Sequence, residues 1–198
     1  MRPIEVKSLV LTLALALSGC ASAPDGGGSG IATLAVTDLA GKSVDPLTEG
    51  GRATVLVFLA VDCPISNRYA PELQRLQRSF AAEDVVFWFV FPDPTASAES
   101  VRQHTQEFGY ETRQVLLDRR HELVKHSRAT TTPEVAVFAD AGRLIYHGRI
   151  DDRFPDFGTA RGSPTSSDLE EVLTAMVRGA RIPKNYAKAV GCYIPSLE

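Results

Sequence analysis

The sequence predicts a single α/β domain in which helices flank a central mixed β-sheet, and three observations support this. Two continuous apolar runs, at residues 54–61 (TVLVFLAV) and 85–91 (VVFWFVF), are typical of strands covered on both faces. Each is followed by a segment with helix-like character, and this alternation predicts parallel strands. Two further strand-like runs, at 134–139 and 143–148, are so close together that they form an antiparallel hairpin, which makes the sheet mixed.

The first half of the chain begins with a loosely alternating segment, 31–38, which predicts a strand. After the strand at 54–61, apolar side chains recur at helical spacing from Ser66 onward, at Tyr69, Leu73, Leu76 and Phe80. Pro64 suits the first position of this helix. Pro71 lies inside it and is expected to bend it.

The second half predicts further elements, in this order: a helix at 98–108 capped by Ser97, a strand at 115–117, a helix at 122–127, the hairpin of 134–148, and a last helix that ends at Gly179. Ser167 and Glu170 form a capping box before the last helix. The polar loop at 150–166 is longer than most loops in compact domains. We interpret its charged cluster as solvated, with ligand binding as the alternative; the cluster comprises Asp151, Asp152, Arg153 and Arg161.

The first 19 residues have the features of a signal peptide. Arg2 and Lys7 precede a short apolar stretch that is well under the roughly 18 residues of a spanning helix. The sequence LSGC at 17–20 resembles the lipobox of bacterial lipoproteins, which implies cleavage before Cys20 and lipidation of that residue. Ala21 follows, and this favours the outer membrane. We therefore expect a lipid-anchored protein of the bacterial cell envelope that faces the periplasm.

The remaining chain divides into a flexible tether at 20–30, one domain at 31–182 and a C-terminal tail at 183–198. The net charge of the whole chain is −3. Loss of the signal peptide, with its two basic residues and one acidic residue, makes it −4. No basic surface for nucleic acid is predicted from this balance.

Cys63 is the candidate nucleophile, because it stands where the strand at 54–61 gives way to Pro64 and a helix. Unpaired N–H groups of a first helical turn favour the thiolate over the thiol, so we expect an acidic and accessible sulfur. The alternative is a small buried apolar residue. Apart from Cys20, the other cysteine is Cys192. Sequence separation does not decide whether Cys63 and Cys192 pair, since a disulfide needs Cα atoms within about 7 Å.

A βαβ half, a cysteine at a helix start, an X-Pro step, a hairpin and a last helix together resemble a thioredoxin-like fold. The segments DCPISNRY at 62–69 and GRIDDR at 148–153 are similar to those of bacterial envelope redoxins of the AhpC/TSA type, including TlpA-like proteins. The resemblance implies a thiol-disulfide oxidoreductase acting on protein or small-molecule thiols and disulfides, with no cofactor. It also implies a cis bond before Pro133, with the backbone of Thr132 pairing with an extended substrate.

The chain departs from the Cys-x-x-Cys pattern of these oxidoreductases, because Ser66 occupies the second cysteine position. A single nucleophilic cysteine still forms a mixed disulfide, but its release needs another thiol. That thiol belongs to Cys192 or to a partner. Cys192 therefore has two interpretations, a resolving residue or an incidental thiol in the tail.

Two alternative functions come from other relatives of the fold. Thiol peroxidases carry a proline and a threonine ahead of the nucleophile, where this chain has Leu56 and Ala60; Arg149 is the candidate for their remote peroxide-binding arginine. Sco-type copper proteins need a second cysteine where this chain has Asn67. Cys63 and Cys192 with one histidine could still bind Cu(I), although no metal site is predicted from the spacing of the histidines.

Overall fold

The computed structural model describes residues 34–139 and 142–197. The predicted signal peptide, Cys20 and the tether lie outside the described residues, so their assignment stays a prediction. Within the described part of the chain, none of the helices has the length and apolar character needed to cross a membrane.

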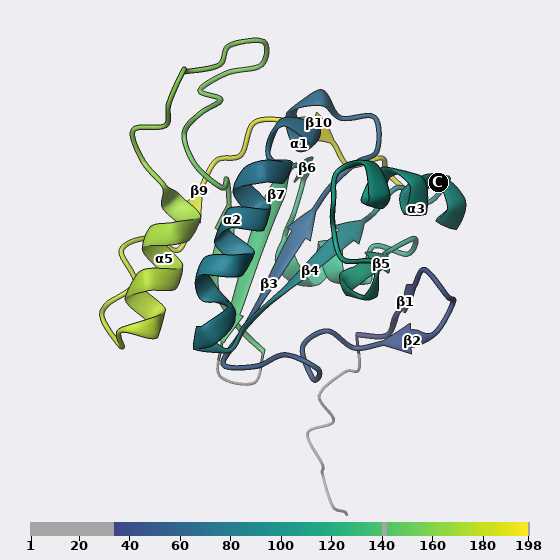
Figure 1. Ribbon diagram of the computed structural model, residues 1–198, viewed down its shortest axis with the longest axis horizontal. Helices are drawn as coiled ribbons and strands as arrows, with labels where there is room; N and C mark the ends of the chain where they lie inside the picture. The colour runs from purple at the N-terminus through teal and green to yellow at the C-terminus, as the bar shows by residue number, and fades with distance from the viewer. Residues whose placement is uncertain (1–33, 140–141, 198) are drawn as a thin grey trace, which may run out of the picture. The chain divides into compact units, whose positions relative to one another are not determined.

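Eight strands form one sheet in the order β2-β1-β5-β4-β3-β7-β8-β9 (Figure 1). The strands of this sheet are β1 (Val36–Asp38), β2 (Ser43–Val44), β3 (Ala53–Phe58), β4 (Val85–Phe91), β5 (Val115–Leu117), β7 (Glu134–Ala139), β8 (Arg143–Gly148) and β9 (Tyr186–Ala187). A separate pair consists of β6 (Thr131–Thr132) and β10 (Cys192–Tyr193). The helices are α1 (Pro64–Arg68), α2 (Ala70–Phe80), α3 (Ala98–Glu107), α4 (Glu122–Ser127) and α5 (Asp168–Val177), with 3-10 turns at Ala81–Glu83 and Thr112–Gln114.

The predicted mixed sheet is confirmed. β3 runs parallel to β4 and β4 parallel to β5, whereas β7 is antiparallel to both β3 and β8. The run predicted as a strand at 54–61 stops pairing at Phe58, so that its last three residues lead into the loop that carries Cys63. Within the first predicted strand, at 31–38, β1 begins at Val36, so Leu34 and Ala35 lie outside it, and residues 31–33 lie outside the described residues.

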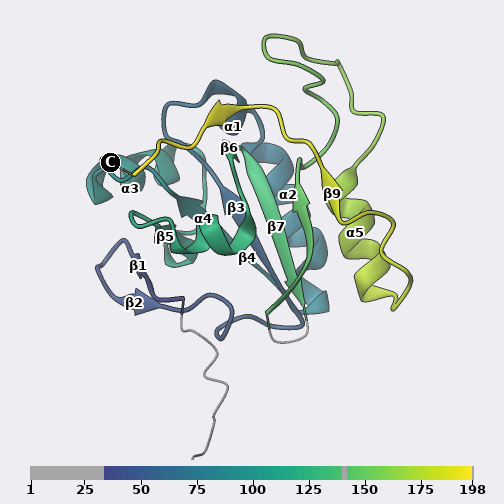
Figure 2. The same ribbon diagram turned by 180° about the vertical axis from the view of Figure 1, so that it is seen from behind.

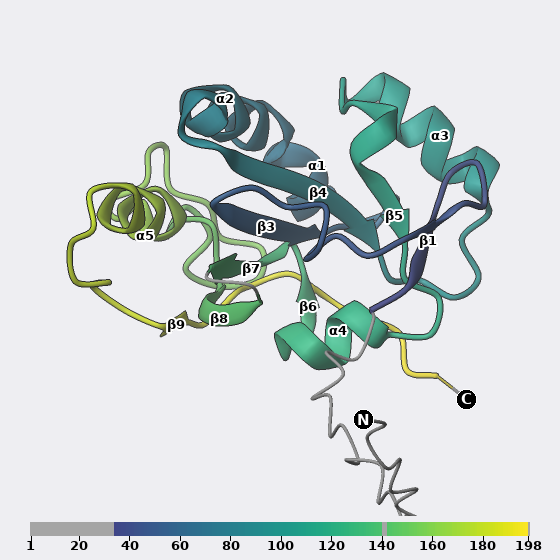
Figure 3. The ribbon, with the colours of Figure 1, turned by 90° about the horizontal axis from the view of Figure 1, so that it is seen from below.

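Alternate side chains of the central strands enter two separate cores, as the two-residue period of a strand requires. Val55 and Val57 of β3 belong to the core that α2, α3 and α5 cover. Leu56 and Phe58 belong to the core on the opposite face, where α4 packs. Figure 3 shows α2, α3 and α5 on one side of the sheet and α4 on the other.

The predicted bend after Cys63 is a break between two helices. Tyr69 ends α1 and precedes α2, with Pro71 in the first turn of α2. Proline has no N–H to donate to the preceding turn, so the helix restarts rather than continuing. The short helix α1 is thereby separated from α2 directly after the site.

The two predicted helix caps had different outcomes. The Ser97 side chain accepts a hydrogen bond from the amide of Ser100, which confirms the cap of α3. The capping box at Ser167 is wrong, because its hydroxyl makes no capping bond. The amide of Leu169, near the start of α5, instead donates to the carbonyl of Ile150 at 3.0 Å, which removes a donor that a serine cap would use.

The interpretation of the loop carboxylates as solvated is wrong. Asp151 is only 3% exposed and Asp152 only 6%. Asp151 accepts from the hydroxyl of Tyr69, and Asp152 accepts from the backbone and hydroxyl of Thr165 and pairs with Arg161. Buried carboxylates are tolerated when they are hydrogen-bonded and paired in this way. They therefore fix the shape of the long loop.

Asp168, at the start of α5, is fully buried and joins two other parts of the chain. Its carboxylate accepts from Nε of Arg149 at 2.7 Å, just after β8, and from Nζ of Lys184 at 2.6 Å, just before β9. Burial by itself raises the pKa of Asp168, but the hydrogen bonds from Arg149 and Lys184 outweigh it and lower the pKa. The ion pair consequently holds β8, α5 and the entry to β9 together.

We expect Asp168→Asn to reduce the free energy of unfolding by about 1.5–3 kcal/mol near neutral pH, the usual contribution of hydrogen bonds to charged groups. Because folding lowers the pKa of this carboxyl from 3.8, its contribution is complete above pH 3.8 and disappears as the pH falls through the folded-state pKa. Urea unfolding across this pH range measures the effect. The matched control is Asp156→Asn, at an exposed loop position, and an equal loss in both variants would contradict the prediction.

Candidate functional site

Cys63 caps the short helix α1, as the sequence predicts. It has extended backbone angles and precedes Pro64, the first residue of the helix. Its thiol lies against the Thr132–Pro133 step, donating a hydrogen bond to the carbonyl of Thr132 at 3.1 Å. The bond between Thr132 and Pro133 is cis, which confirms the predicted isomer. Residues distant in sequence therefore meet at the carboxyl end of β3.

Cys192 comes to the same place on the C-terminal tail. β10 pairs antiparallel with β6, with Cys192 opposite Thr132 and Tyr193 opposite Thr131. Figure 2 shows the tail crossing beside β6 and α1. Both cysteines are free thiols. After burial, the interaction with the other cysteine is the next cause of the pKa shift of each, so the predicted nucleophile and the predicted resolving thiol lie close together.

Four donors surround the sulfur of Cys63 and favour its thiolate. Burial raises the pKa of Cys63, but hydrogen bonds from the side chains and backbone amides of Cys192 and Ser66 outweigh it, so that the pKa falls below the ordinary value of 9.0. The hydroxyl of Ser66 is buried and has no hydrogen-bond partner in the described structure, so it is available to a thiolate at Cys63. Ser66 thus replaces the second cysteine of the Cys-x-x-Cys pattern with a donor.

Cys192 is affected in the opposite direction. Burial raises its pKa, and the hydrogen bond to Cys63 and the charges of Cys63 and Asp62 raise it further, to about 12. Asp62 is exposed and its charge acts on Cys192. Of the two thiols, Cys63 therefore loses its proton first as the pH rises, while Cys192 keeps its own.

The expected accessibility of Cys63 is wrong for this arrangement of the chain. The exposed fraction of Cys63 is 0%. In burial, Cys63 therefore matches the alternative interpretation, a small buried apolar residue. Its polar surroundings do not fit that alternative, because a merely apolar cysteine needs no cluster of donors. The tail strand β10 lies directly at the sulfur, so access depends on the tail.

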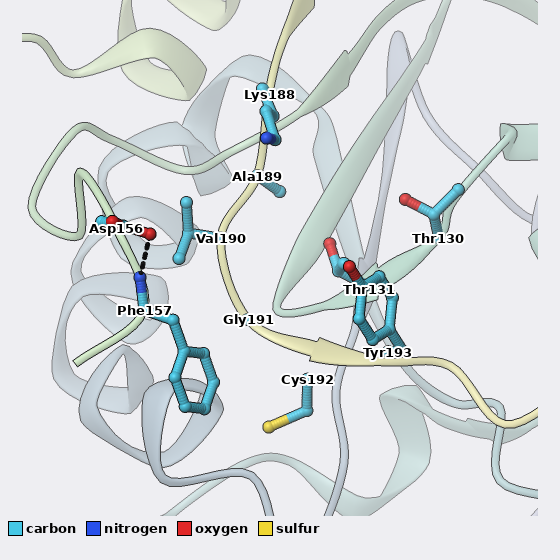
Figure 4. A pocket seen from close by; sticks show the side chains of 10 residues that line it. All are labelled: Thr130, Thr131, Asp156, Phe157, Lys188, Ala189, Val190, Gly191, Cys192 and Tyr193. Atoms are coloured by element: carbon cyan, nitrogen blue, oxygen red, sulfur yellow. Dashed lines mark hydrogen bonds between the residues drawn. The ribbon is translucent and has the colours of Figure 1, made fainter.

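A cavity of about 580 Å³ lies beside the C-terminal tail (Figure 4). Its lining residues are Thr130, Thr131, Asp156, Phe157 and the stretch from Lys188 to Tyr193. Cys192 is partly exposed and lines this cavity, and it also lines a smaller cavity of about 140 Å³ with Asp62 and Thr132. Cys192, unlike Cys63, is open to approaching molecules.

Arg149, predicted to bind substrate, makes its ion pair with Asp168, so a role of Arg149 in substrate binding stays a prediction. The histidines have contacts elsewhere: His104 with Asn67, His121 with the carbonyl of Pro92, His126 with the ring of Phe138, and His147 with Glu134. Across the described residues, no group of three or more histidine, cysteine or acidic side chains is arranged to hold a metal ion.

Sequence reasoning missed two contributors to this site. Ser66 was noted only as a missing cysteine, although a hydroxyl at that position is itself a donor. Gly191 was not singled out at all. A Cβ atom built on Gly191 would lie 2.7 Å from the carbonyl carbon of Thr132 and 3.2 Å from Cδ of Pro133, so only glycine allows the tail to approach so closely. The dipeptide Gly191-Cys192 was the available signal.

Comparison with known proteins agrees with this architecture. A family model described as Redoxin matches residues 21–173. An uncharacterized conserved protein from Geobacillus kaustophilus has 26% identity and a TM-score of 0.70, covering 82% of this chain and 88% of its own. A hypothetical protein from Sinorhizobium meliloti has 23% identity and a TM-score of 0.69, over 81% and 88% of the two chains.

A secreted Mycobacterium tuberculosis disulfide oxidoreductase has the same fold at 18% identity and a TM-score of 0.51, covering 74% of this chain and 96% of its own. No curated protein matches the sequence significantly. These similarities confirm the thioredoxin-like fold.

We expect Cys192→Ala to raise the pKa of Cys63, because it removes the thiol donor that stabilises the thiolate. Cys192→Ser, which keeps a donor, should restore much of the lowered pKa. The pH dependence of Cys63 alkylation, followed by peptide mass mapping so that each cysteine is read separately, measures both values. If the two variants leave the midpoint of Cys63 where it is in the wild type, Cys192 does not stabilise the thiolate.

Proposed function

The chain belongs to the Redoxin family, and from this premise we propose that it is a thiol-disulfide oxidoreductase in which Cys63 is the nucleophile and Cys192 resolves the mixed disulfide. The observation that carries the proposal is the placement of Cys192 at Cys63 by the pairing of β10 with β6. The fold shared with a secreted disulfide oxidoreductase supports the same reaction class.

The first step is attack of the Cys63 thiolate on a substrate disulfide. A bond forms between Cys63 and one substrate sulfur, and the other sulfur leaves as a thiolate. Cys192 then loses its proton and attacks the sulfur of Cys63, which releases the first substrate sulfur as a thiolate. In total the substrate disulfide is reduced by two electrons to two thiols, and the enzyme is oxidised to a Cys63–Cys192 disulfide.

The pKa of Cys192 determines when the second step can occur. While Cys63 is a thiolate, its charge and its hydrogen bond keep the proton on Cys192, whose pKa is about 12. Once Cys63 enters a mixed disulfide, its negative charge is gone and that cause of the raised pKa disappears. Cys192 therefore becomes a better nucleophile only after the first step has occurred.

Reduction of the enzyme disulfide takes place at Cys192. An incoming thiolate can approach Cys192 from the cavity it lines, whereas Cys63 is fully buried. The thiol with the lower pKa is the better leaving group, and this is Cys63. Attack at Cys192 thus returns the Cys63 thiolate, and a second thiol of the reductant removes the reductant from Cys192.

Disulfides persist mainly in oxidising compartments, so disulfide substrates are abundant at the location that the lipoprotein signal of the sequence predicts. The proposal therefore places the protein in the bacterial envelope, attached through lipid on Cys20 and facing the periplasm, with the outer membrane as the favoured site. Protein and small-molecule disulfides are its substrates. Nucleic acid is not a partner.

The lipid anchor predicts that the full chain incorporates radiolabelled palmitate in a bacterial host and partitions with the membrane. Cys20→Ala should abolish the label and release the protein, since the acyl chains are attached to that residue. The matched control is Cys192→Ala, which leaves the labelling unchanged. Labelling that persists in the Cys20 variant would remove the anchor from the proposal.

The catalytic roles predict distinct effects for the two cysteines in a disulfide-reduction assay. Cys63→Ser lowers the rate to that without enzyme, because the nucleophile is lost. Cys192→Ser retains the first step and accumulates a mixed disulfide on Cys63, visible by intact mass. Equal rates for the wild type and Cys63→Ser would refute catalysis at this residue. Reduction of hydrogen peroxide in place of the disulfide would instead favour the peroxidase alternative.

A further inference from the structure

The tail strand β10 occupies the backbone edge of β6 beside the cis bond of Pro133. Cys192 and Tyr193 pair with Thr132 and Thr131, and the amide of Ile194 extends the contact by donating to the carbonyl of Thr130 at 3.1 Å. The hydroxyl of Thr132 also donates to the carbonyl of Cys192. In the described structure β6 pairs with no other strand, so its pairing edge is filled by the chain itself.

Gly191 sets how closely β10 approaches this edge. Its Cα faces the Thr132–Pro133 peptide so closely that an added methyl group would overlap the carbonyl of Thr132. Because an added Cβ meets backbone atoms there, a side chain at this position can only be accommodated by moving the tail. Close packing here coincides with complete burial of Cys63, the reactive atom next to the same peptide.

We propose that Gly191 and β10 determine the substrate specificity of Cys63, by closing the β6 edge to extended peptide disulfides in the reduced protein. This inference rests on the proposed function. Extended peptides bind by adding a strand to a free edge, and β10 holds the edge of β6, so β10 must detach fully before such a substrate pairs there and reacts. A small disulfide needs only enough displacement of Cys192 to reach the sulfur of Cys63.

Because β10 must leave β6 before a peptide disulfide can react, only a fraction of the molecules is reactive toward such a substrate at any time. The observed rate with a peptide disulfide is the intrinsic rate multiplied by the fraction of molecules in which β10 has left β6. Any change that loosens β10 raises this fraction. Such a change favours peptide substrates over small ones, and it also exposes Cys63 to reagents that do not depend on catalysis.

Gly191→Ala tests this directly, with Gly162→Ala as the matched control. A Cβ at Gly162 meets no atom within 4 Å, so this control makes the same chemical change without a collision. The first readout is the rate at which iodoacetamide modifies Cys63 in the full chain, followed by mass mapping and normalised to the thiolate fraction. We expect an increase of about tenfold or more for Gly191→Ala, in proportion to the open population, and none for Gly162→Ala.

The second readout compares two substrates, hydroxyethyl disulfide and a linear peptide carrying one glutathionylated cysteine. Gly191→Ala should raise the rate of the first step with the peptide more than with hydroxyethyl disulfide. Faster amide exchange at Tyr193 should accompany this change. Unchanged alkylation of Cys63 would overturn the closing role of β10, and an equal gain with both substrates would overturn the assignment of specificity.

Ile194→Pro keeps the test decisive if Gly191→Ala does not fold, because it removes the amide that donates to Thr130 and leaves Gly191 in place. The same two readouts apply, with the same expected directions. The two readouts also distinguish failure of the proposed function from failure of this inference. If the wild type reduces neither disulfide, catalysis is refuted, while the alkylation result still decides whether β10 covers Cys63.

Discussion

The pairing of two residues of β10 with two residues of β6 is the interaction on which the candidate site depends. Without it, Cys63 has a carbonyl from Thr132 and donors from Ser66, but no second sulfur. With it, the chain places a thiol and an amide from Cys192 at the same atom. A short antiparallel contact at the end of the chain thereby replaces the second cysteine that a Cys-x-x-Cys helix would supply from its own first turn.

This replacement separates two properties that usually occur together in a reactive cysteine. Low pKa requires many hydrogen-bond donors at the sulfur, whereas reactivity requires an open approach. In this chain the residue with the lowered pKa is closed and the residue with the open approach has a raised pKa. Under the proposed function, the reduced site is thus protected from indiscriminate disulfides, and exchange would begin with movement of the tail.

The sequence predicted the fold well because its signals are local. The apolar run at 85–91, the strand at 115–117 and the helix at 122–127 all have the predicted bounds, since their periodicity and turn residues agree with their tertiary packing. The wrong predictions concern groups whose environment depends on distant residues. Burial of Asp152 requires Thr165 and Arg161 to converge on it, and the failed cap at Ser167 depends on the carbonyl of Ile150.

The site could be predicted only in part for the same reason. Cys63 and Pro133 were found because each stands at a recognisable local position, before a helix and before a strand. The sequence does not predict whether Cys63 and Cys192 lie close together, because the number of residues between two cysteines does not determine the distance between their Cα atoms. The close approach at Gly191 is to Thr132 and Pro133, which are distant in the sequence, and a single glycine in a tail carries no sign of such a partner.

The position to which Cys192 returns is fixed by a second contact upstream. β9 joins the sheet beside β8, where the amide of Arg149 donates to the carbonyl of Ala187 at 2.9 Å. Gly148 has a φ of +134° and leaves room for that carbonyl, and Lys184 pairs with Asp168 just before β9. Movement of β10 is therefore confined to the few residues after Ala187. A tether this short gives Cys192 a high effective concentration near Cys63, so the proposed mechanism predicts that resolution within the chain is faster than attack by an external thiol.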